Sequence, residues 1–211
     1  MKKFLLILLS ILCCIFVVSC NNANSTSSKN TSQEEDKLPI QSTPQEEDPP
    51  AMLAFSSFED IKNFIVASEN SESYDKYVTD NHIMSVSYND AQNVANNLLN
   101  VPLPYTALAS EMGGTYYIER NEFDLIFKVN GIRYRFIYLF GGRELTYQGE
   151  PDLLDVPLED YNIDLYKRDT CYLGIFECES VNVDVAIYTS QAKDVSFEAF
   201  ELKPIESIIA D

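Results

Sequence analysis

The feature that most limits how this chain can fold is a pair of alternating apolar runs on either side of Asn130-Gly131. In both runs, every second residue is large and apolar: Phe123, Leu125, Phe127, Val129, Ile132, Tyr134, Phe136 and Tyr138. Because successive side chains of a strand point to opposite faces, each run has one apolar face. Asn-Gly between two such runs is the strongest short-range signal of a β-hairpin. The sequence therefore predicts antiparallel strands with one face turned to a core.

The same pattern recurs 49 residues further along the chain. At this offset Asn130-Gly131 falls on Glu179-Ser180 and Phe127 falls on Phe176, and the alternation stays in phase. We predict two successive three-stranded meanders, over about 115–140 and 163–189, and interpret them as a pseudo-repeat. A chance alignment of two hairpin-rich segments is the alternative.

Helical periodicity precedes the strands. We predict helices over about 57–67, capped by Ser56 or Ser57, and over about 90–100, capped by Asn89. Between them, Ile83 to Tyr88 is consistent with a short strand or an ordered loop. At the end of the chain, 197–210 is either a strand continuation or a closing helix. The predicted fold class is α+β, with two N-terminal helices packed on a curved antiparallel meander sheet.

The N-terminus predicts where the protein resides. Two lysines precede an apolar run from Phe4 to Val18, which is shorter than the about 20 residues that a membrane-spanning helix needs. The run ends in Val17-Val18-Ser19-Cys20, which resembles the lipobox of bacterial lipoproteins. The resemblance implies removal of residues 1–19 and acylation of Cys20, with palmitate-type chains that hold the protein stably at a membrane. An uncleaved signal anchor and ordinary secretion are the alternatives.

Residues 20–51 are polar and acidic and contain two copies of Gln-Glu-Glu-Asp, at 33–36 and 45–48. This composition predicts a disordered tether, and the duplication is typical of replication slippage. Residues 52–211 are then one domain. Signal and tether are similar to those of lipoproteins of low-GC Firmicutes, which implies a cell-membrane anchor on the extracytoplasmic face of a Gram-positive cell. The order of meanders and helices faintly resembles small uncharacterised domains of such proteins, a likeness that assigns no residue a role.

The net charge of −18 becomes −20 once Lys2 and Lys3 are removed with the signal. Such a chain repels nucleic acid and anionic headgroups, so we expect no nucleic-acid partner. The membrane is a partner through the lipid at Cys20 alone, and the identity of a further ligand or protein partner is left open.

Few residues are candidates for catalysis or metal binding. The single histidine, His82, has no recognisable nucleophile nearby and is interpreted as a loop or surface residue rather than a general base. Cys171 and Cys178 fall on opposite faces of one predicted strand, too far apart for a disulfide, so we expect free thiols and no ordinary zinc site. Six acids crowd 150–164 and could bind calcium, although they lack the usual loop pattern and are better explained as a solvated acidic loop.

The chain has 13 tyrosines, 12 phenylalanines and no tryptophan. Strand tyrosines mostly complete a sheet, but on a concave sheet they could line a ligand site. Arg133 and Arg135 lie on one strand face, where they either balance nearby acids or form an anion-binding pair.

No catalytic, cofactor-binding or metal-binding residue is assigned, and an enzyme is the less favoured class. The leading hypothesis is a non-catalytic, lipid-anchored binding or interaction module. One alternative is a carrier of an apolar or lipid-like ligand enclosed between sheet and helices. The other is an extracytoplasmic hydrolase that uses two facing carboxylates.

Overall fold

The computed structural model describes residues 50–83, 86–143 and 145–208. The predicted signal, the lipobox residues with Cys20 and all but the end of the predicted tether lie outside the described residues. The elements along the chain are β1 Met52–Phe55, α2 Phe58–Ala67, α3 Ser71–Asn81, α4 Tyr88–Leu99, β2 Leu103–Tyr105, β3 Ala109–Tyr117, β4 Glu122–Val129, β5 Ile132–Leu139, β6 Leu153–Leu158, β7 Tyr161–Arg168, β8 Cys171–Cys178, β9 Val181–Tyr188, a 3₁₀ turn at Ala192–Asp194, β10 Glu201–Lys203 and α5 Ile205–Ile208.

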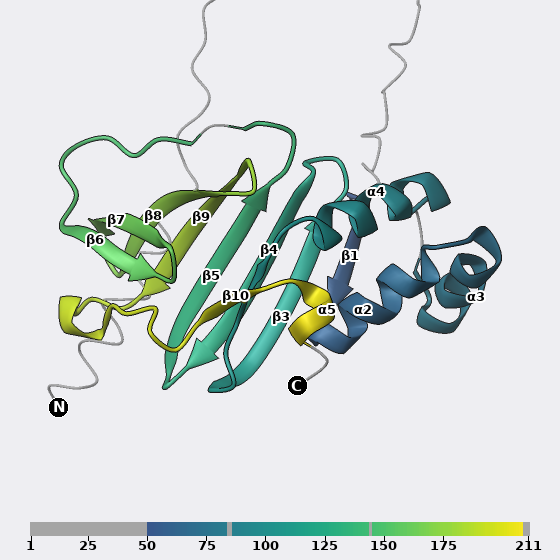
Figure 1. Ribbon diagram of the computed structural model, residues 1–211, viewed down its shortest axis with the longest axis horizontal. Coiled ribbons are helices and arrows are strands. Elements are labelled where there is room, and N and C mark those ends of the chain that lie inside the picture. The colour runs from purple at the N-terminus through teal and green to yellow at the C-terminus, as the bar shows by residue number, and fades with distance from the viewer. Residues whose placement is uncertain (1–49, 84–85, 144, 209–211) are drawn as a thin grey trace, which may run out of the picture. The chain divides into compact units, whose positions relative to one another are not determined.

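Eight strands form one sheet in the order β1-β3-β4-β5-β9-β8-β7-β6, and all of its strand pairs are antiparallel (Figure 1). The short strands β2 and β10 pair with each other in a second sheet. The helices gather at the β1 end of the large sheet. The fold class is therefore α+β.

The predicted hairpins are confirmed. Asn130 and Gly131 join β4 to β5 with φ angles of 51° and 82°, the left-handed conformation that a two-residue hairpin turn requires. The corresponding turn between β8 and β9 uses Glu179 and Ser180 at φ angles of 49° and 63°. Neither of these is the glycine or asparagine that usually occupies such positions. The apolar alternation of β8 and β9 therefore specifies this hairpin even though its turn residues are unfavourable for the left-handed conformation.

The pairing of β4 with β5 and that of β8 with β9 have the same register. Leu125 lies opposite Phe136, and at the 49-residue offset Gly174 lies opposite Val185. The two hairpins meet where β5 pairs with β9, and Phe136 there faces Val185, its own counterpart at that offset. The first meander begins at Ala109, earlier than predicted, and β6 adds a fourth strand before the second.

One face of the sheet carries the core. The apolar residues that alternate along β4, β5 and β9 are buried, with Phe123, Leu125, Phe136 and Val185 fully inaccessible. Aromatic rings from α2 and from the C-terminal segment pack against them. Phe58 of α2 contacts Phe127 of β4, and Phe197 contacts Phe136 of β5. Aromatic burial thus fixes the helices and the C-terminal segment on the same side of the sheet.

Three helices precede the long strands, where the sequence predicted two. The additional helix, α3, buries only Tyr74, so its sequence carries no apolar stripe to reveal it. The predicted cap Ser57 is confirmed for α2. For α4 the prediction of Asn89 is wrong, because the Ser87 hydroxyl accepts the hydrogen bond from the Asp90 amide.

The described residues between Ile83 and Ser87 form a connection rather than a strand. The C-terminal segment contains both proposed elements, the short strand β10 and the single turn α5. Within the described residues, none of the helices has the length and apolar character needed to cross a membrane.

Candidate functional site

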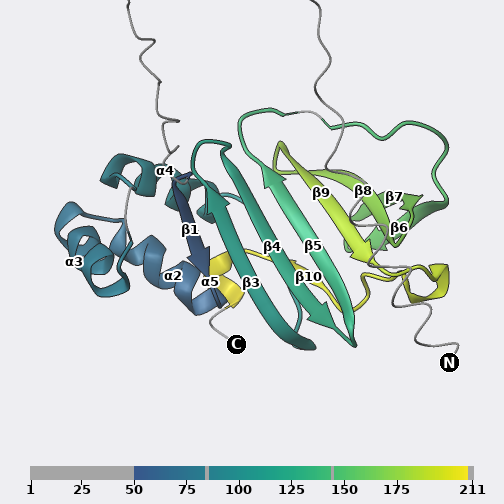
Figure 2. The same cartoon turned by 180° about the vertical axis from the view of Figure 1, so that it is seen from behind.

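The strand residues that alternate with the core residues form the opposite side of the large sheet, which we call the open face. Figure 2 looks onto it over β3, β4 and β5, with β10 behind the strands. From β3 to β7, its charged and tyrosine residues are Glu111, Tyr117, Glu122, Asp124, Lys128, Arg133, Arg135, Asp184, Tyr188, Glu177, Asp164, Tyr166 and Arg168. Arg120 and Arg143, in the connections at one end, extend it. All five arginines of the chain therefore belong to this face.

At one end, two arginines enclose a buried carboxylate. Glu122 is 7 % exposed, and its oxygens lie 3.7 Å from Arg120 Nη1 and 3.6 Å from Arg143 Nη1. The guanidinium of Arg120 also stacks on the Tyr117 ring, 3.8 Å from its centre. The charge of Glu122 is thus neutralised from two sides.

At the centre, Arg135 binds Asp124 through two parallel hydrogen bonds of 2.9 and 2.7 Å. Asp124 is 6 % exposed, so the carboxylate of this ion pair is buried, whereas the Arg135 side chain is 34 % exposed. The hydrogen bonds to Asp124 raise the pKa of Arg135 above its already high ordinary value. The prediction that these strand arginines balance nearby acids is confirmed for Arg135, and the bidentate geometry makes this contact specific.

A second carboxylate, Asp184, lies on the neighbouring strand opposite Ile137. Burial raises the pKa of Asp184, whereas the hydrogen bond from Tyr147 and the charge of Arg135 act in the other direction. The Tyr147 hydroxyl donates that hydrogen bond over 2.5 Å. Since Tyr147 belongs to the connection between β5 and β6, this bond fastens part of that connection to the open face, and burial together with Asp184 raises the pKa of Tyr147.

At the other end, Arg133 and Arg168 present their charges without a carboxylate partner. Arg133 lies over the Tyr188 ring at 5.8 Å, and Arg168 lies 5.9 Å from the ring of Tyr147. In the part of the chain that the structure describes, no carboxylate oxygen comes within 4 Å of either guanidinium. Tyr188 and Ile126 beside them are 40 % and 36 % exposed. This end therefore combines free positive charge with exposed apolar surface.

Both carboxylates at the centre of the open face are already engaged by neighbouring side chains. Asp124 is engaged by Arg135 and Asp184 by Tyr147, so the two carboxylates do not converge on a shared open space. General acid–base catalysis needs a carboxylate free to exchange a proton with a bound substrate. Arginine and tyrosine, by contrast, are the residue types that most often dominate binding energy at protein interfaces.

The other predicted candidates lie apart from this face. His82 ends α3 in the left-handed conformation, with its Nδ1 3.0 Å from the Thr79 carbonyl oxygen, and is exposed. The interpretation as a surface histidine is therefore confirmed.

The two cysteines are free thiols, as predicted. Cys171 begins β8 and Cys178 ends it, and burial raises the pKa of both thiols. Cys178 faces the core, where the Tyr161 hydroxyl lies 3.4 Å from its sulfur. Neither thiol is activated as a nucleophile, since activation requires a lowered pKa.

The acidic residues of 150–164 do not converge on one site, because two of them accept hydrogen bonds from different backbone amides. Asp152 accepts a hydrogen bond from the Lys167 amide, and Asp164 accepts one from the Asp155 amide. Over 50–83, 86–143 and 145–208, no three His, Cys, Asp or Glu side chains are grouped as metal ligands. The geometry gives the calcium hypothesis no support.

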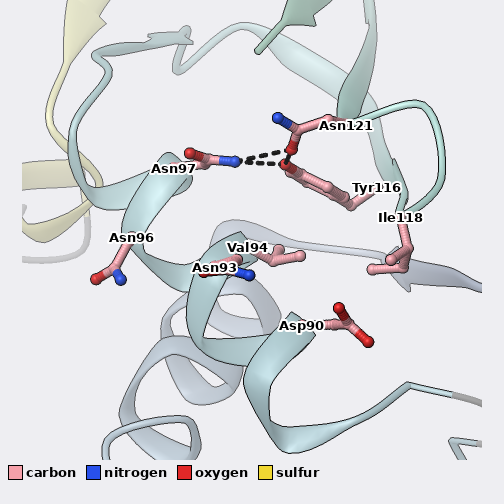
Figure 3. A pocket seen from close by; sticks show the side chains of 8 residues that line it. All are labelled: Asp90, Asn93, Val94, Asn96, Asn97, Tyr116, Ile118 and Asn121. Carbon is pink, nitrogen blue, oxygen red and sulfur yellow. Dashed lines mark hydrogen bonds between the residues drawn. The ribbon is translucent and has the colours of Figure 1, made fainter. Parts of the chain in front are cut away.

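A pocket of about 400 Å³ lies between α4 and the turn that joins β3 to β4 (Figure 3). Asn97 of α4 donates hydrogen bonds to the Tyr116 hydroxyl, at 2.6 Å, and to Asn121 Oδ1, at 3.0 Å. Tyr116 in turn donates to the same Asn121 oxygen, and burial raises the pKa of Tyr116 to about 12. We call these three residues the amide triad. The sequence pattern did not predict these three residues as a site, although the polar side of α4 is rich in asparagine.

No protein-family model, curated protein or solved structure matches this chain.

Proposed function

We propose that the protein is a lipid-anchored binding module of the extracytoplasmic cell surface, without catalytic activity, and that the open face is its interaction surface. The observation that carries the proposal is the placement of every arginine of an acidic chain on this one face. Three of them lie over tyrosine rings, those of Tyr117, Tyr188 and Tyr147.

The end of the open face near Arg133 indicates which class of partner would bind. Arg133 and Arg168 offer unneutralised charge, while Tyr188 and Ile126 offer exposed apolar area. A polyanion would pair with the arginines but would leave the apolar side chains exposed. A protein partner that carries carboxylates would bury the arginine charges and the apolar side chains together. The partner class is therefore an acidic protein surface rather than a nucleic acid, which the net charge of −18 repels.

The membrane anchor is the other part of the proposal. Acylation at Cys20, after removal of residues 1–19, would display the domain at the outer side of the membrane, as in Gram-positive lipoproteins. Two acyl chains hold a protein stably, with about 0.8 kcal/mol contributed by each buried methylene. Support comes from the lipobox-like run Val17-Val18-Ser19-Cys20 and the short apolar stretch before it.

An internal duplication explains how such a face could arise. We infer that the two hairpins are repeats, because their registers agree at one offset and Phe136 faces its own counterpart Val185. Arg135 and Asp184 are then equivalent positions that carry opposite charges. An ancestral pair of identical hairpins could have placed opposite charges side by side by a single substitution in one copy.

The filled core disfavours the alternative of an apolar-ligand carrier. Phe123, Phe127 and Phe136 are at most 1 % exposed, and rings from α2 and from 197–200 occupy the space above them. A carrier needs an apolar cavity of several hundred cubic ångströms. The pockets along the described part of the chain open to the surface and have mixed polar linings.

A co-purification experiment on the native, detergent-solubilised protein tests this proposal. The Arg133→Ala/Tyr188→Ala variant should lose a partner that the wild type retains, by at least tenfold, since hot-spot truncations each cost about 2 kcal/mol or more. Higher salt should release the partner as well, because exposed ion pairs are screened. Lys62→Ala/Lys76→Ala, which removes charge from the helices, is the matched control. Equal recovery with both variants would show that the open face is not the interaction surface.

A further inference from the structure

The amide triad lines a pocket that the open-face proposal does not use. The pocket lies on the side of the domain where α4 meets the β3–β4 turn, and its lining combines Asp90, Asn93, Val94 and Ile118 with the triad (Figure 3). No lysine or arginine contributes to it. Its ligand is therefore one that needs no positive partner, which excludes phosphates and carboxylates as the recognised groups.

The triad is fixed before any ligand arrives. The two hydrogens of Asn97 Nδ2 go to the Tyr116 hydroxyl and to Asn121 Oδ1, and the Tyr116 proton goes to that same oxygen. Asn121 is held in the left-handed conformation, at φ 49°, which sets the direction of its side chain. Each member thus orients the other two, and little side-chain entropy is left to lose on binding.

Several hydrogen-bonding groups of the pocket lining remain available to a ligand. Asn97 Oδ1 remains as an acceptor and Asn121 Nδ2 as a double donor, since the described residues provide neither with a partner. Asn93 adds a complete carboxamide, and Asp90 adds the oxygen that Ser87 does not use. The lining therefore offers both hydrogen-bond donors and acceptors.

Figure 3 shows how polar and apolar groups are distributed. The amide triad forms one side, Asp90 and Ile118 lie across from it, and Val94 lies between them. Asn96 points away from the triad. A ligand seated here would meet hydrogen-bonding groups at its edge and apolar carbon against one surface.

We propose that the amide-triad pocket binds a neutral sugar of one or two residues. A sugar hydroxyl both donates and accepts, so a ring of hydroxyls matches a lining that offers amide donors and acceptors together, and the C–H side of the ring matches Val94 and Ile118. The volume of about 400 Å³ lies within the range of small-molecule sites. A peptide is the poorer match, because its amides repeat along an extended line rather than around a compact ring.

Isothermal titration with the detergent-solubilised full chain tests the proposal, using glucose, N-acetylglucosamine, maltose and chitobiose as probes and tetra-alanine as the peptide probe. We expect at least one sugar to bind with a dissociation constant in or below the millimolar range and tetra-alanine not to bind. Asn93→Ala should weaken sugar binding at least fivefold. Asn121→Gly should weaken it at least tenfold, because glycine keeps the left-handed turn and deletes the amide.

Asn89→Ala is the matched control, since Asn89 is an exposed asparagine of α4 outside the pocket lining. Its affinity should equal that of the wild type. If no sugar in the panel binds at about ten millimolar, if tetra-alanine binds instead, or if Asn93→Ala binds sugar as tightly as the wild type, the proposal is wrong. Should Asn121→Gly unfold, the Asn93→Ala and Asn89→Ala pair still decides the question, because both residues are exposed.

Discussion

At the residue scale, one glycine shows how closely β7 packs against β8. A Cβ added to Gly174 would come within 2.7 Å of Ile163 Cγ2 and of Leu165 Cδ2, and within 2.8 Å of the Asp164 carbonyl oxygen. Real Cβ atoms do not tolerate such distances, and a backbone oxygen cannot rotate aside. The phenylalanine-rich first hairpin has leucine at the equivalent position, Leu125, so the two halves fill the core differently.

We therefore expect Gly174→Ala to destabilise the domain by about 1–3 kcal/mol, the usual cost of overpacking a core. Urea unfolding of purified protein measures this. The matched variant is Gly113→Ala, another strand glycine, whose added Cβ would meet nothing within 4 Å. Equal stability of the two variants would contradict the packing of β7 against β8.

The buried carboxylate of Asp184 gives the folded protein a pH dependence. Burial raises the pKa of Asp184 in the folded state above its unfolded value of about 3.8. Folding then favours the protonated form, so the contribution of this residue to stability falls as pH rises through the raised pKa and stays low above it. The charge of Arg135 offsets part of this loss.

Asp184→Asn should remove this pH dependence of stability, while its amide oxygen can still accept the hydrogen bond from the Tyr147 hydroxyl. Relative to wild type, this variant should gain stability between about pH 3 and about pH 7, as measured by thermal unfolding at each pH. Asp160→Asn, at an exposed turn, serves as the control and should follow the wild type. The stability that Asp184→Asn gains over the wild type should grow as the pH rises. If this difference in stability shrinks with rising pH instead, the charged form of Asp184 is not buried at a cost.

At the scale of the elements, the local signals were predictable from sequence and the long-range pairings were not. Asn130-Gly131 and the alternation around it identify one hairpin, because turn chemistry and strand period depend on neighbouring residues alone. The pairing of β5 with β9 depends on residues about 50 apart, and nothing local specifies it. Helix α3 escaped prediction because Tyr74 is its only buried residue.

The candidate sites were less predictable than the fold. The sequence places Arg133 and Arg135 on one strand face, but it does not show which of them forms an ion pair. In the fold, Asp124 of β4 pairs with Arg135 and not with Arg133. The amide triad joins residues of α4, β3 and a turn, and its orientation rests on the left-handed Asn121. A sequence pattern gives neither the partner nor that conformation.

The start of α4 provides an element-scale prediction. Ser87→Ala should destabilise the domain by about 1 kcal/mol, because it removes the side-chain acceptor for the Asp90 amide at the helix N-terminus. Asn89→Ala should change the free energy of unfolding by less than about 0.5 kcal/mol. Chemical denaturation of both variants decides which residue caps the helix, and the reverse order would restore the assignment made from sequence.

At the scale of the whole molecule, charge is distributed unevenly. The chain carries 33 acids against 15 lysines and arginines, yet its arginines collect on the open face, while most phenylalanines of the described residues lie in the core on the opposite side of the sheet. One side of the sheet therefore carries the buried core, and the other is the surface that we propose binds a partner. An acidic surface elsewhere would keep the domain away from the anionic headgroups to which a lipid at Cys20 would tether it.

The account rests on display of this domain by a lipid, and the intact mass of the protein isolated from its native membrane tests that claim most directly. We predict a mature chain that begins at Cys20 and carries a diacylglyceryl group in thioether linkage. A Cys20→Ala variant should lack this added mass and leave the detergent phase of a phase separation. A native chain that retains Met1, or that begins at an unmodified Cys20, would contradict the account.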